Sequence, residues 1–503
     1  MGRLAKQMKN PRGQQSRMGP KADNSGWFTQ VVTHPFRFEN RTNKTLVLIF
    51  FVMNGLVLAN ALLHPAAVGY DAPNHLEYIK VLSEPRLPTP QETNQFYVPP
   101  LPYALPALVH SLGLFGFEKV AKLSQLLNVL YSILLTVYVI KICRLARPRD
   151  ALFAITSLAL AGMLPVYYKT MAFVRGEPLL TLLTVFSVYK TLTIGVKNDT
   201  RIAQMIGLGI SLGLLILTRQ MGLLVLGAVV LFMVILALRS EQQQGISFKV
   251  IASVMFITVV VGGWFYIYHF KRYGTVAVFN RSPSPAFSIS NQPREFYIGL
   301  GLDKLFSDPI RRSFPNQFLP IFYSEVWGDY WCDFLVYGRI SERGPFLSGW
   351  LLDQHLFQDP PRRLETNRFE IRTYLGRVNL VSLVPSAVYL VGVLLGMVYL
   401  VQFISNLVAD ERRVVYSLLA MVIGLSAIGY FCFLIRYPSP LKGDTIKATY
   451  MLQIFPFVSI LASEVLLRIK HKSAYGYLGV MVMLFVALLH NFPVFVTHYT
   501  SWP

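Results

Sequence analysis

Long apolar segments separated by short polar connections fill most of this chain. About eleven of them approach the roughly 20 apolar residues that a bilayer-spanning helix needs. The pattern therefore predicts an all-α membrane protein with about eleven transmembrane helices. The expected spans lie near residues 45–63, 120–142, 150–168, 176–195, 202–217, 221–238, 249–270, 379–404, 414–434, 448–467 and 474–492.

Charged residues in the connections predict the orientation of these spans. Residues 1–44 are polar and basic, and no short apolar core with a small-residue cleavage site follows them. We therefore expect a cytoplasmic tail rather than a signal peptide. With the amino terminus inside, the short basic connections, such as 141–149 and 468–472, all face the cytoplasm, as the positive-inside rule requires. Eleven spans then leave the carboxyl terminus outside.

Two connections on the outer side are too long to be simple turns. The first outer loop covers residues 64–119, inside a transmembrane region that we place at 45–270. A large outer loop follows at 271–378, and C-terminal transmembrane helices are expected at 379–503. Long loops in compact proteins often carry function, so we expect binding or catalytic residues in these two loops.

The composition narrows the class of protein further. Apolar residues make up 53% of the 503 positions and charged residues only 15%, which excludes a soluble enzyme and a disordered protein. The net charge is +21. In a multispan protein such an excess mostly reflects basic residues in cytoplasmic loops that face anionic lipid, so it does not indicate a nucleic-acid partner. Cys143, Cys332 and Cys432 offer neither a disulfide framework nor a metal-ligand spacing.

The stretch GYDAPNHLEYI, residues 69–79, follows the first span. Asp71 can cap a short helix that starts at the next residue. His75 and Tyr78 then lie on one face of that helix, near Asp71. A carboxylate at the outer membrane surface can serve as a base that meets both a lipid-borne and a water-borne substrate. The alternative is an ordinary cap on a polar interfacial helix.

A second motif, YVPPLPY at residues 97–103, leads into another apolar run. Together, the D-x-x-x-H pattern of Asp71 to His75 and this P-P-L-x-Y pattern resemble the first outer loop of the family C fold of membrane glycosyltransferases. That family includes protein O-mannosyltransferases, the lipid A aminoarabinose transferase and oligosaccharyltransferase. The sharp motifs cover only residues 70–105, whereas the order of spans and loops resembles the family over the whole chain.

The resemblance implies a fold, a donor and a set of roles. It implies two juxtamembrane helices in the first outer loop, a polyprenyl-phosphate-linked sugar donor, and inversion at the anomeric carbon. Asp71 would be the catalytic base, and His75 and Tyr78 would orient it or contact the acceptor. Many members carry a second acid beside the first, where this chain has Ala72 and Pro73. We therefore assign no metal, and a divalent cation remains the alternative.

Family members also often carry an acid in the second outer loop, where Glu177 is the candidate here. The alternative is that Glu177 pairs with Arg175 or Lys169 at the interface, or caps the first turn of the next span. Arg219 lies in a short outward-facing turn, where it could contact a phosphate or anchor the helix end in the interface.

Basic residues gather in the last outer loop at Arg436, Lys442 and Lys447. Cations at a helix start are unfavourable to the helix dipole. Because a bound phosphate would compensate for this, we interpret the three residues as ligands of the donor phosphate. Attraction to anionic lipid headgroups is the alternative.

The large outer loop contains a dense group of aromatic and acidic residues. Aromatic rings stack on the C–H face of a sugar and carboxylates accept bonds from its hydroxyls, so a sugar or acceptor wall is expected here. Membrane-interface aromatics are the alternative. The residues are Glu325, Trp327, Asp329 and Trp331.

These patterns lead to one functional hypothesis and one main rival, with a non-catalytic scaffold or polymerase subunit as a weaker alternative. The hypothesis is an integral membrane glycosyltransferase that moves a sugar from a polyprenyl-phosphate carrier to a glycan, lipid or protein acceptor on the outer face. The expected location is a bacterial inner membrane, with the endoplasmic reticulum as the alternative. The rival is a transporter or flippase for lipid-linked glycans. Missing repeats and the scarcity of acids within the spans count against this rival.

Overall fold

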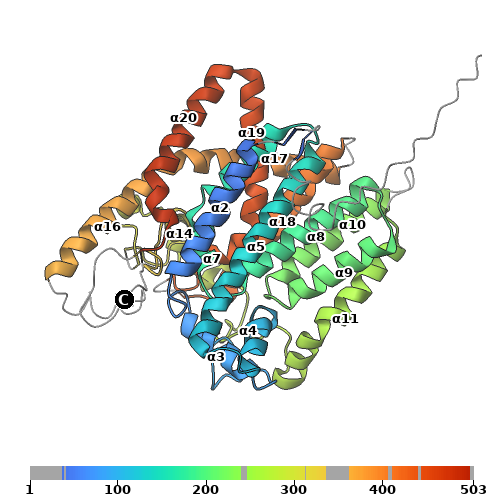
Figure 1. The fold of residues 1–503 in the computed structure, drawn as a ribbon, viewed down its shortest axis with the longest axis vertical. Helices are drawn as coiled ribbons and strands as arrows, with labels where there is room; N and C mark the ends of the chain where they lie inside the picture. Colours follow the sequence, from blue (N-terminus) through green and yellow to red (C-terminus); the bar gives the residue numbers. More distant parts are fainter. Residues whose placement is uncertain are drawn as a thin grey trace, which may run out of the picture.

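The computed structural model describes residues 37–38, 41–42, 44–239, 246–311, 313–335, 362–405, 410–439 and 443–498. In these ranges the regular elements are helices, apart from one short antiparallel pair, β1 (Arg37–Phe38) and β2 (Arg41–Thr42). The helices form a bundle of long, roughly aligned rods with smaller helices at one end (Figure 1). The expected all-α membrane fold is confirmed.

The bundle consists of long helices and of the shorter bent pair α6 and α7. They are α2 (Lys44–Leu63), α5 (Phe117–Ala146), α6 (Ala151–Gly162), α7 (Pro165–Ala172), α8 (Glu177–Lys197), α9 (Ile202–Ile216), α10 (Gly222–Arg239), α11 (Phe248–Tyr273), α16 (Arg362–Val381), α17 (Leu383–Ile404), α18 (Glu411–Arg436), α19 (Phe455–Lys472) and α20 (Ala474–Asn491). The short elements are α3 (Ala72–Leu82), α4 (Leu101–Ser111), α12 (Arg294–Ile298), α13 (Leu302–Leu305), α14 (Phe318–Trp327) and the 3-10 turns η3 (Ile289–Asn291), η4 (Ala448–Ile454) and η5 (Phe492–Phe495).

The number of spans differs in detail from the expected eleven. Within the described ranges, nine helices are long and apolar enough to cross a membrane, and α6 with α7 makes a tenth if this bent pair is one span. The pair bends by 64°, at a break that Pro165 follows. A proline removes a backbone donor and clashes with the preceding turn, which favours such a break. The remaining expected span corresponds to α9, whose 15 residues fall short of the usual length.

Glycines let α9 pack closely along α11. A methyl group added at Gly209 or Gly213 would come within 2.7 Å or 2.6 Å of the Cβ atoms of Ile257 and Val261. The Thr258 hydroxyl also donates to the Gly209 carbonyl at 3.2 Å. Small residues four apart are a common device for close helix contact in lipid, where no hydrophobic effect drives the helices together.

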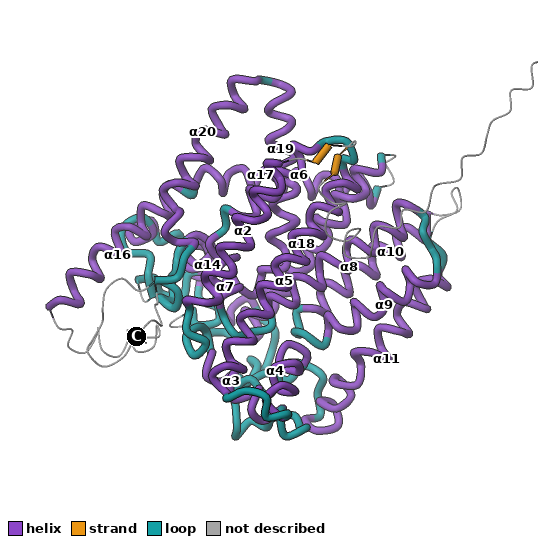
Figure 2. The backbone as a smooth tube through the Cα atoms, in the orientation of Figure 1, coloured by secondary structure: helices purple, strands orange, loops and turns teal. Residues whose placement is uncertain are grey.

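The outer-loop elements gather at one end of the bundle, where Figure 2 shows loop segments beside α3, α4 and α14. The two expected juxtamembrane helices are present as α3 and α4. The turn between α19 and α20, which follows Lys470 and Lys472 at the end of α19, lies at the far end (Figure 1). The chain after α20 returns to α2, where Asn60 donates to the Phe495 carbonyl at 2.7 Å and accepts from the Thr497 amide at 2.8 Å.

Candidate functional site

Asp71 occupies the N-cap position of α3 but does not cap it with its side chain. Its backbone is left-handed, with φ 56°, and no backbone amide of the helix donates to the carboxylate. Instead, Oδ2 lies 3.1 Å from Nζ of Lys447, at the start of η4. The Asp71 side chain is 41% exposed. The helix therefore begins where the sequence predicts, while its acid is available for another role.

Lys447 lies among aromatic rings as well as beside Asp71. Its ammonium is 5.2 Å from the ring centre of Tyr70, 5.4 Å from that of Trp331 and 6.0 Å from that of Tyr450. Ring faces attract a cation at such distances. The Tyr430 hydroxyl accepts from the Lys447 amide at 2.8 Å. The backbone of this lysine is thus fixed, and its ammonium is directed into the site.

Charge and burial set the protonation states around α3. Lys447 lowers the pKa of Asp71 to about 2, against the opposing effect of burial, so the carboxylate is ionised at neutral pH. Burial lowers the pKa of His75 to about 3, and the repulsion of Arg219 and Arg175 adds to this. His75 is therefore neutral. Its Nδ1 shares a 2.6 Å hydrogen bond with the Tyr103 hydroxyl, which ties α3 to α4.

Glu177 is held between two arginines. Arg175 Nη2 donates to its carboxylate at 2.8 Å and Arg219 Nε at 3.0 Å. Glu177 is 1% exposed. Glu177 thus forms an ion pair with Arg175, as the alternative interpretation expected, and a second one with Arg219. Lys169 pairs with Glu325 instead. Glu177 is positioned to hold the two guanidinium groups in place.

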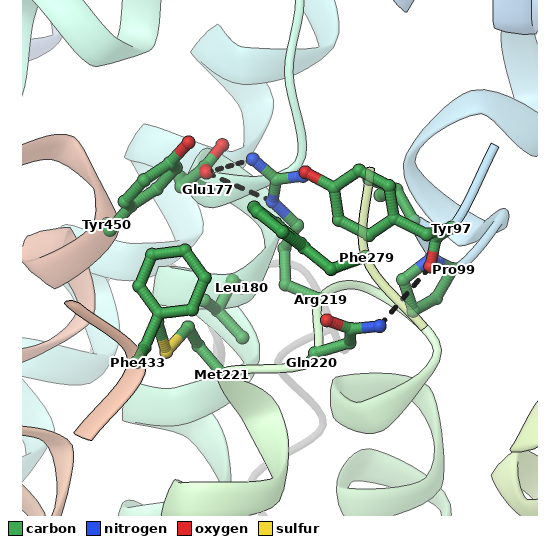
Figure 3. Close-up of a pocket in the computed structure, with 11 residues that line it drawn as sticks. Tyr97, Pro99, Glu177, Leu180, Arg219, Gln220, Met221, Phe279, Phe433 and Tyr450 are labelled. Carbon is green, nitrogen blue, oxygen red and sulfur yellow. Dashed lines mark hydrogen bonds and ion pairs between the residues drawn. The ribbon is translucent and has the colours of Figure 1, made fainter. Parts of the chain in front are cut away.

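An open pocket lies beside this ion pair. Figure 3 shows Arg219 reaching Glu177 across it, with Leu180, Met221 and Phe433 as its apolar side. Tyr450 joins the pocket to the Asp71 site, because its ring lies 5.9 Å from the Arg219 guanidinium and 6.0 Å from the Lys447 ammonium. The lining residues are Tyr97, Val98, Pro99, Glu177, Leu180, Arg219, Gln220, Met221, Phe279, Phe433 and Tyr450.

A buried charge cluster lies behind Tyr70. Lys169 of α7 is 2.6 Å from Oε1 of Glu325 and 3.8 Å from Oδ1 of Asp329. The Tyr70 hydroxyl donates to Glu325. Burial raises the pKa of Glu325, against the lowering effect of Lys169. Asp329 also accepts from the amides of residues 334 and 335 at 2.8 Å and 2.6 Å. The cluster joins α7 to α14. Through Glu325 it also holds the ring of Tyr70, which lies beside the Lys447 ammonium.

The two tryptophans of the expected sugar wall face different surroundings. Trp327 donates to the Ser386 hydroxyl at 2.8 Å and stacks on Tyr389, so it faces α17. Trp331 lies by Lys447, with the Arg311 guanidinium 4.6 Å from its ring. Of the wall residues, the structure brings Trp331 to the Asp71 site, while Glu325 and Asp329 lie in the charge cluster behind it.

The remaining residues singled out from the sequence are Tyr78, Arg436 and Lys442. Tyr78 donates to the Val98 carbonyl at 2.8 Å and so holds α3 against the proline-rich segment. Arg436 ends α18 and donates to the Ser284 carbonyl. Lys442 lies outside the described residues.

Sequence reasoning did not assign Tyr70 or Tyr450 to the site, and it considered Lys169 only as a partner for Glu177. Lys169 had a usable signal, because a lysine inside an apolar segment is a functional candidate by default. The two tyrosines had none, since tyrosine is frequent at membrane interfaces. As for metals, among the described residues no three His, Cys, Asp or Glu side chains are grouped to hold an ion.

No family model matches the chain, and no curated protein matches its sequence. Among solved structures, it is similar to the oligosaccharyltransferase of Archaeoglobus fulgidus in complex with zinc and sulfate, with TM-score 0.48, 12% identity, and coverage of 92% of this chain and 54% of that chain. The chain thus spans little more than half the length of this protein.

Two further solved structures are similar. The archaeal oligosaccharyltransferase AglB from Archaeoglobus fulgidus, in complex with an inhibitory peptide and a dolichol-phosphate, gives TM-score 0.47 and 13% identity over 95% of this chain and 57% of that chain. ArnT from Cupriavidus metallidurans, bound to undecaprenyl phosphate, gives TM-score 0.35 and 16% identity over 83% of this chain and 76% of that chain.

Proposed function

We propose that this protein is an integral membrane glycosyltransferase that transfers a sugar from a polyprenyl-phosphate donor to an acceptor, with Asp71 as catalytic base. The observation that carries the proposal is the state of Asp71. Its carboxylate is ionised, 41% exposed and free of helix capping, whereas Glu177, Glu325 and Asp329 are at most 1% exposed and held by cations or amides. Asp71 is thus the acid of this group that an acceptor hydroxyl can reach.

The chemistry follows from the charges around Asp71. The acceptor hydroxyl gives its proton to Asp71 while its oxygen attacks the anomeric carbon. The bond from that carbon to the phosphate oxygen breaks, and the phosphate leaves with its electron pair and an added negative charge. Attack from the face opposite the phosphate inverts the anomeric carbon. Preorganised cations can stabilise the departing charge without protonating it.

The local charge balance favours a phosphate. Lys447, Arg175 and Arg219 provide three positive charges against the two carboxylates of Asp71 and Glu177, which leaves one positive charge over. Nη1 of Arg175 and Nε1 of Trp331 are buried donors without a hydrogen-bond partner among the described residues. Buried donors are costly when unpaired, so a ligand rich in oxygen atoms suits this site.

The pocket beside Arg219 suits the lipid part of the donor. Its wall is mainly aromatic and aliphatic, and its charged side faces the cationic group around Tyr450. Ligand sites commonly combine an apolar lining with a few placed polar groups. We place the first isoprene units of a polyprenyl chain in this pocket and the phosphate between Arg219 and Lys447. Glu177 then positions Arg219 and takes no proton.

The orientation and the membrane are part of the proposal. The site lies at the end of the bundle opposite the α19–α20 turn, where Lys470, His471 and Lys472 end α19 (Figure 1). The positive-inside rule then places the amino terminus in the cytoplasm and the site on the outer face. A bacterial inner membrane, with a glycan, lipid or protein acceptor outside, fits this arrangement.

Asp71→Asn tests the proposed function. Asparagine has nearly the same size, and the change removes the base without removing a cap, because Asp71 makes no capping bond. With a labelled lipid-linked sugar and membrane extract as acceptor source, transfer should fall by about 10²–10⁴-fold while the protein stays folded. Asp303→Asn, at an exposed acid of α13, is the matched control and should keep full activity.

Two outcomes would overturn the proposal. A folded Asp71→Asn protein that keeps more than about a tenth of its turnover would exclude Asp71 as the base. Movement of the lipid-linked sugar across the membrane without a covalent product, by the unaltered protein, would favour the transporter or flippase.

A further inference from the structure

The large outer loop is fastened to the last turn of α18. The Ser284 amide donates to the carbonyl of residue 436 at 2.9 Å. Gln292 Nε2 donates to the carbonyl of residue 434 at 2.7 Å, and Asn291 Nδ2 donates to the carbonyl of residue 435 at 3.2 Å. The last carbonyls of a helix lack partners within the helix. Residues 284–292 therefore complete the end of this span.

This attachment fixes the depth of the loop in the membrane. α18 has 26 residues, a length of about 39 Å at about 1.5 Å per residue. The hydrocarbon core is about 30 Å thick. With Glu411, Arg412 and Arg413 at one surface, the last turn of α18 lies in the opposite interface. The segment bonded to this turn must lie at the same level.

At that level the segment exposes apolar side chains. Phe287 is 56% exposed, Ile289 67% and Ile298 59%. Tyr297 of the same segment is also exposed, and its hydroxyl donates to the Ile289 carbonyl at 2.8 Å. A patch of this kind on a water-facing loop marks an interaction site.

The apolar surface is continuous with a lipid-facing side of α18. Phe296, between these exposed residues, is buried and lies 6.2 Å from the ring centre of Phe431 on α18. Ile428 lies one helical turn before Phe431 on the same face and is 61% exposed inside the span. The surface that begins on the lipid-facing part of α18 therefore extends onto the loop.

The shape of the segment is set before any partner binds. The Ser288 hydroxyl accepts from the Ser290 amide at 3.2 Å, and Asn291 donates to the Ala286 carbonyl at 2.8 Å. These bonds hold Phe287 and Ile289 outward. A rigid, amphipathic edge at the interface is what an interfacial membrane anchor requires.

We propose that residues 286–302 form a membrane anchor that inserts Phe287, Ile289 and Ile298 into the outer leaflet. The partner is the lipid surface itself. The anchor stands independently of the proposed function, and it has one consequence for the pocket. Phe279 lines the pocket and lies 4.7 Å from Tyr437, just beyond α18, so the anchor keeps that wall at the level of the lipid headgroups.

Tryptophan quenching by brominated lipid tests the anchor. Phe287→Trp and Ile289→Trp place a reporter at exposed apolar positions, and the matched control is Glu84→Trp, whose native side chain is 63% exposed in the first outer loop. In nanodiscs, we expect bromine near the headgroup end of the acyl chain to quench the added fluorescence at 287 and 289 at least twofold more than at 84. Equal quenching at all three positions would overturn the anchor.

A second measurement uses the unaltered protein. A phospholipid with a photoreactive group near the top of its acyl chain should label peptides that contain residues 286–302. The exposed face of α11, with Val260 63% exposed, provides the positive control. Labelling of α11 without labelling of 286–302 would overturn the anchor. If labelling of the segment decreased as the protein concentration rose, a second copy of the chain would cover it, and the anchor would be overturned.

Discussion

The carboxylate of Asp71 and the ammonium of Lys447 lie 3.1 Å apart, although 376 positions separate them in the sequence. The pair joins the first outer loop to the last. Each residue has an ordinary explanation alone, Asp71 as a helix cap and Lys447 as a headgroup anchor. Their ion pair, with three aromatic rings around the lysine, brings the two residues into one candidate site.

Donor affinity should respond in opposite directions to changes in these two residues. If a donor phosphate binds Lys447, then Lys447→Gln removes a charged hydrogen bond and should weaken donor binding by about 1.5–3 kcal/mol. Asp71→Asn removes a negative charge beside the phosphate and leaves Lys447 without a competing partner. Its donor affinity should therefore rise several-fold. Titration with labelled polyprenyl phosphate measures both effects.

Lys80→Gln is the control for this experiment, because Lys80 lies on the same helix as the site but pairs with Glu77 in an exposed position. It should bind donor normally. Unchanged donor affinity in both Lys447→Gln and Asp71→Asn would mean that the donor phosphate does not bind at this ion pair. Lys447 would then be interpreted as an anchor to lipid headgroups.

The pH dependence of transfer should also depend on Lys447. Lys447 is the main cause that lowers the pKa of Asp71 to about 2. A base must be deprotonated to act, so the activity of the unaltered protein should not fall through Asp71 protonation between pH 8 and about 4. In Lys447→Gln the pKa of Asp71 rises, and the acid limb of kcat/KM should move to higher pH. Coinciding acid limbs in the two proteins would contradict this assignment.

Thiol labelling can test the orientation. Glu84→Cys, in the first outer loop, should react with a membrane-impermeant reagent in intact cells. Ser473→Cys, in the α19–α20 turn, should react only after permeabilisation, because its neighbours are basic and the positive-inside rule keeps them in the cytoplasm. Both are made in a Cys432→Ser background, since Cys432 is the exposed cysteine among the three. Labelling of both sites in intact cells would reverse or break the proposed topology.

Much of the fold could be predicted because a bilayer imposes one simple condition on the sequence. A spanning helix must be long and apolar, and the nine qualifying helices all lie near predicted spans. The exceptions have local causes. Pro165 marks the break between α6 and α7, and α9 is short. Hydropathy averages over about 19 residues, so it does not register a bend within a span.

Less of the site could be predicted, because its contacts are long-range. The sequence indicated Asp71 and Lys447 separately, by motif and by charge, but nothing local pairs residues so far apart. Trp327 and Trp331 are four positions apart in an aromatic stretch, yet one faces α17 and the other the site. α14 ends at Trp327, so the regular side-chain directions of a helix do not extend to Trp331.

The buried cluster of Lys169, Glu325 and Asp329 gives a prediction about stability. Lys169→Met would leave two buried carboxylates without their cation. Removal of one partner from a buried ion pair commonly costs about 3–5 kcal/mol, because the remaining charge is neither hydrated nor paired. We therefore expect a large loss in the free energy of unfolding, measured by thermal or denaturant unfolding in detergent.

Glu325→Gln in the Lys169→Met background should recover part of that loss. The double variant has one buried carboxylate fewer, and Asp329 still accepts from two amides. The two changes should thus be clearly non-additive. Since Tyr70 donates to Glu325 and its ring lies by Lys447, donor affinity should fall in Glu325→Gln even where the protein remains folded. Additive losses, or single variants within about 0.5 kcal/mol of the unaltered protein, would mean that the cluster is not the electrostatic support of this site.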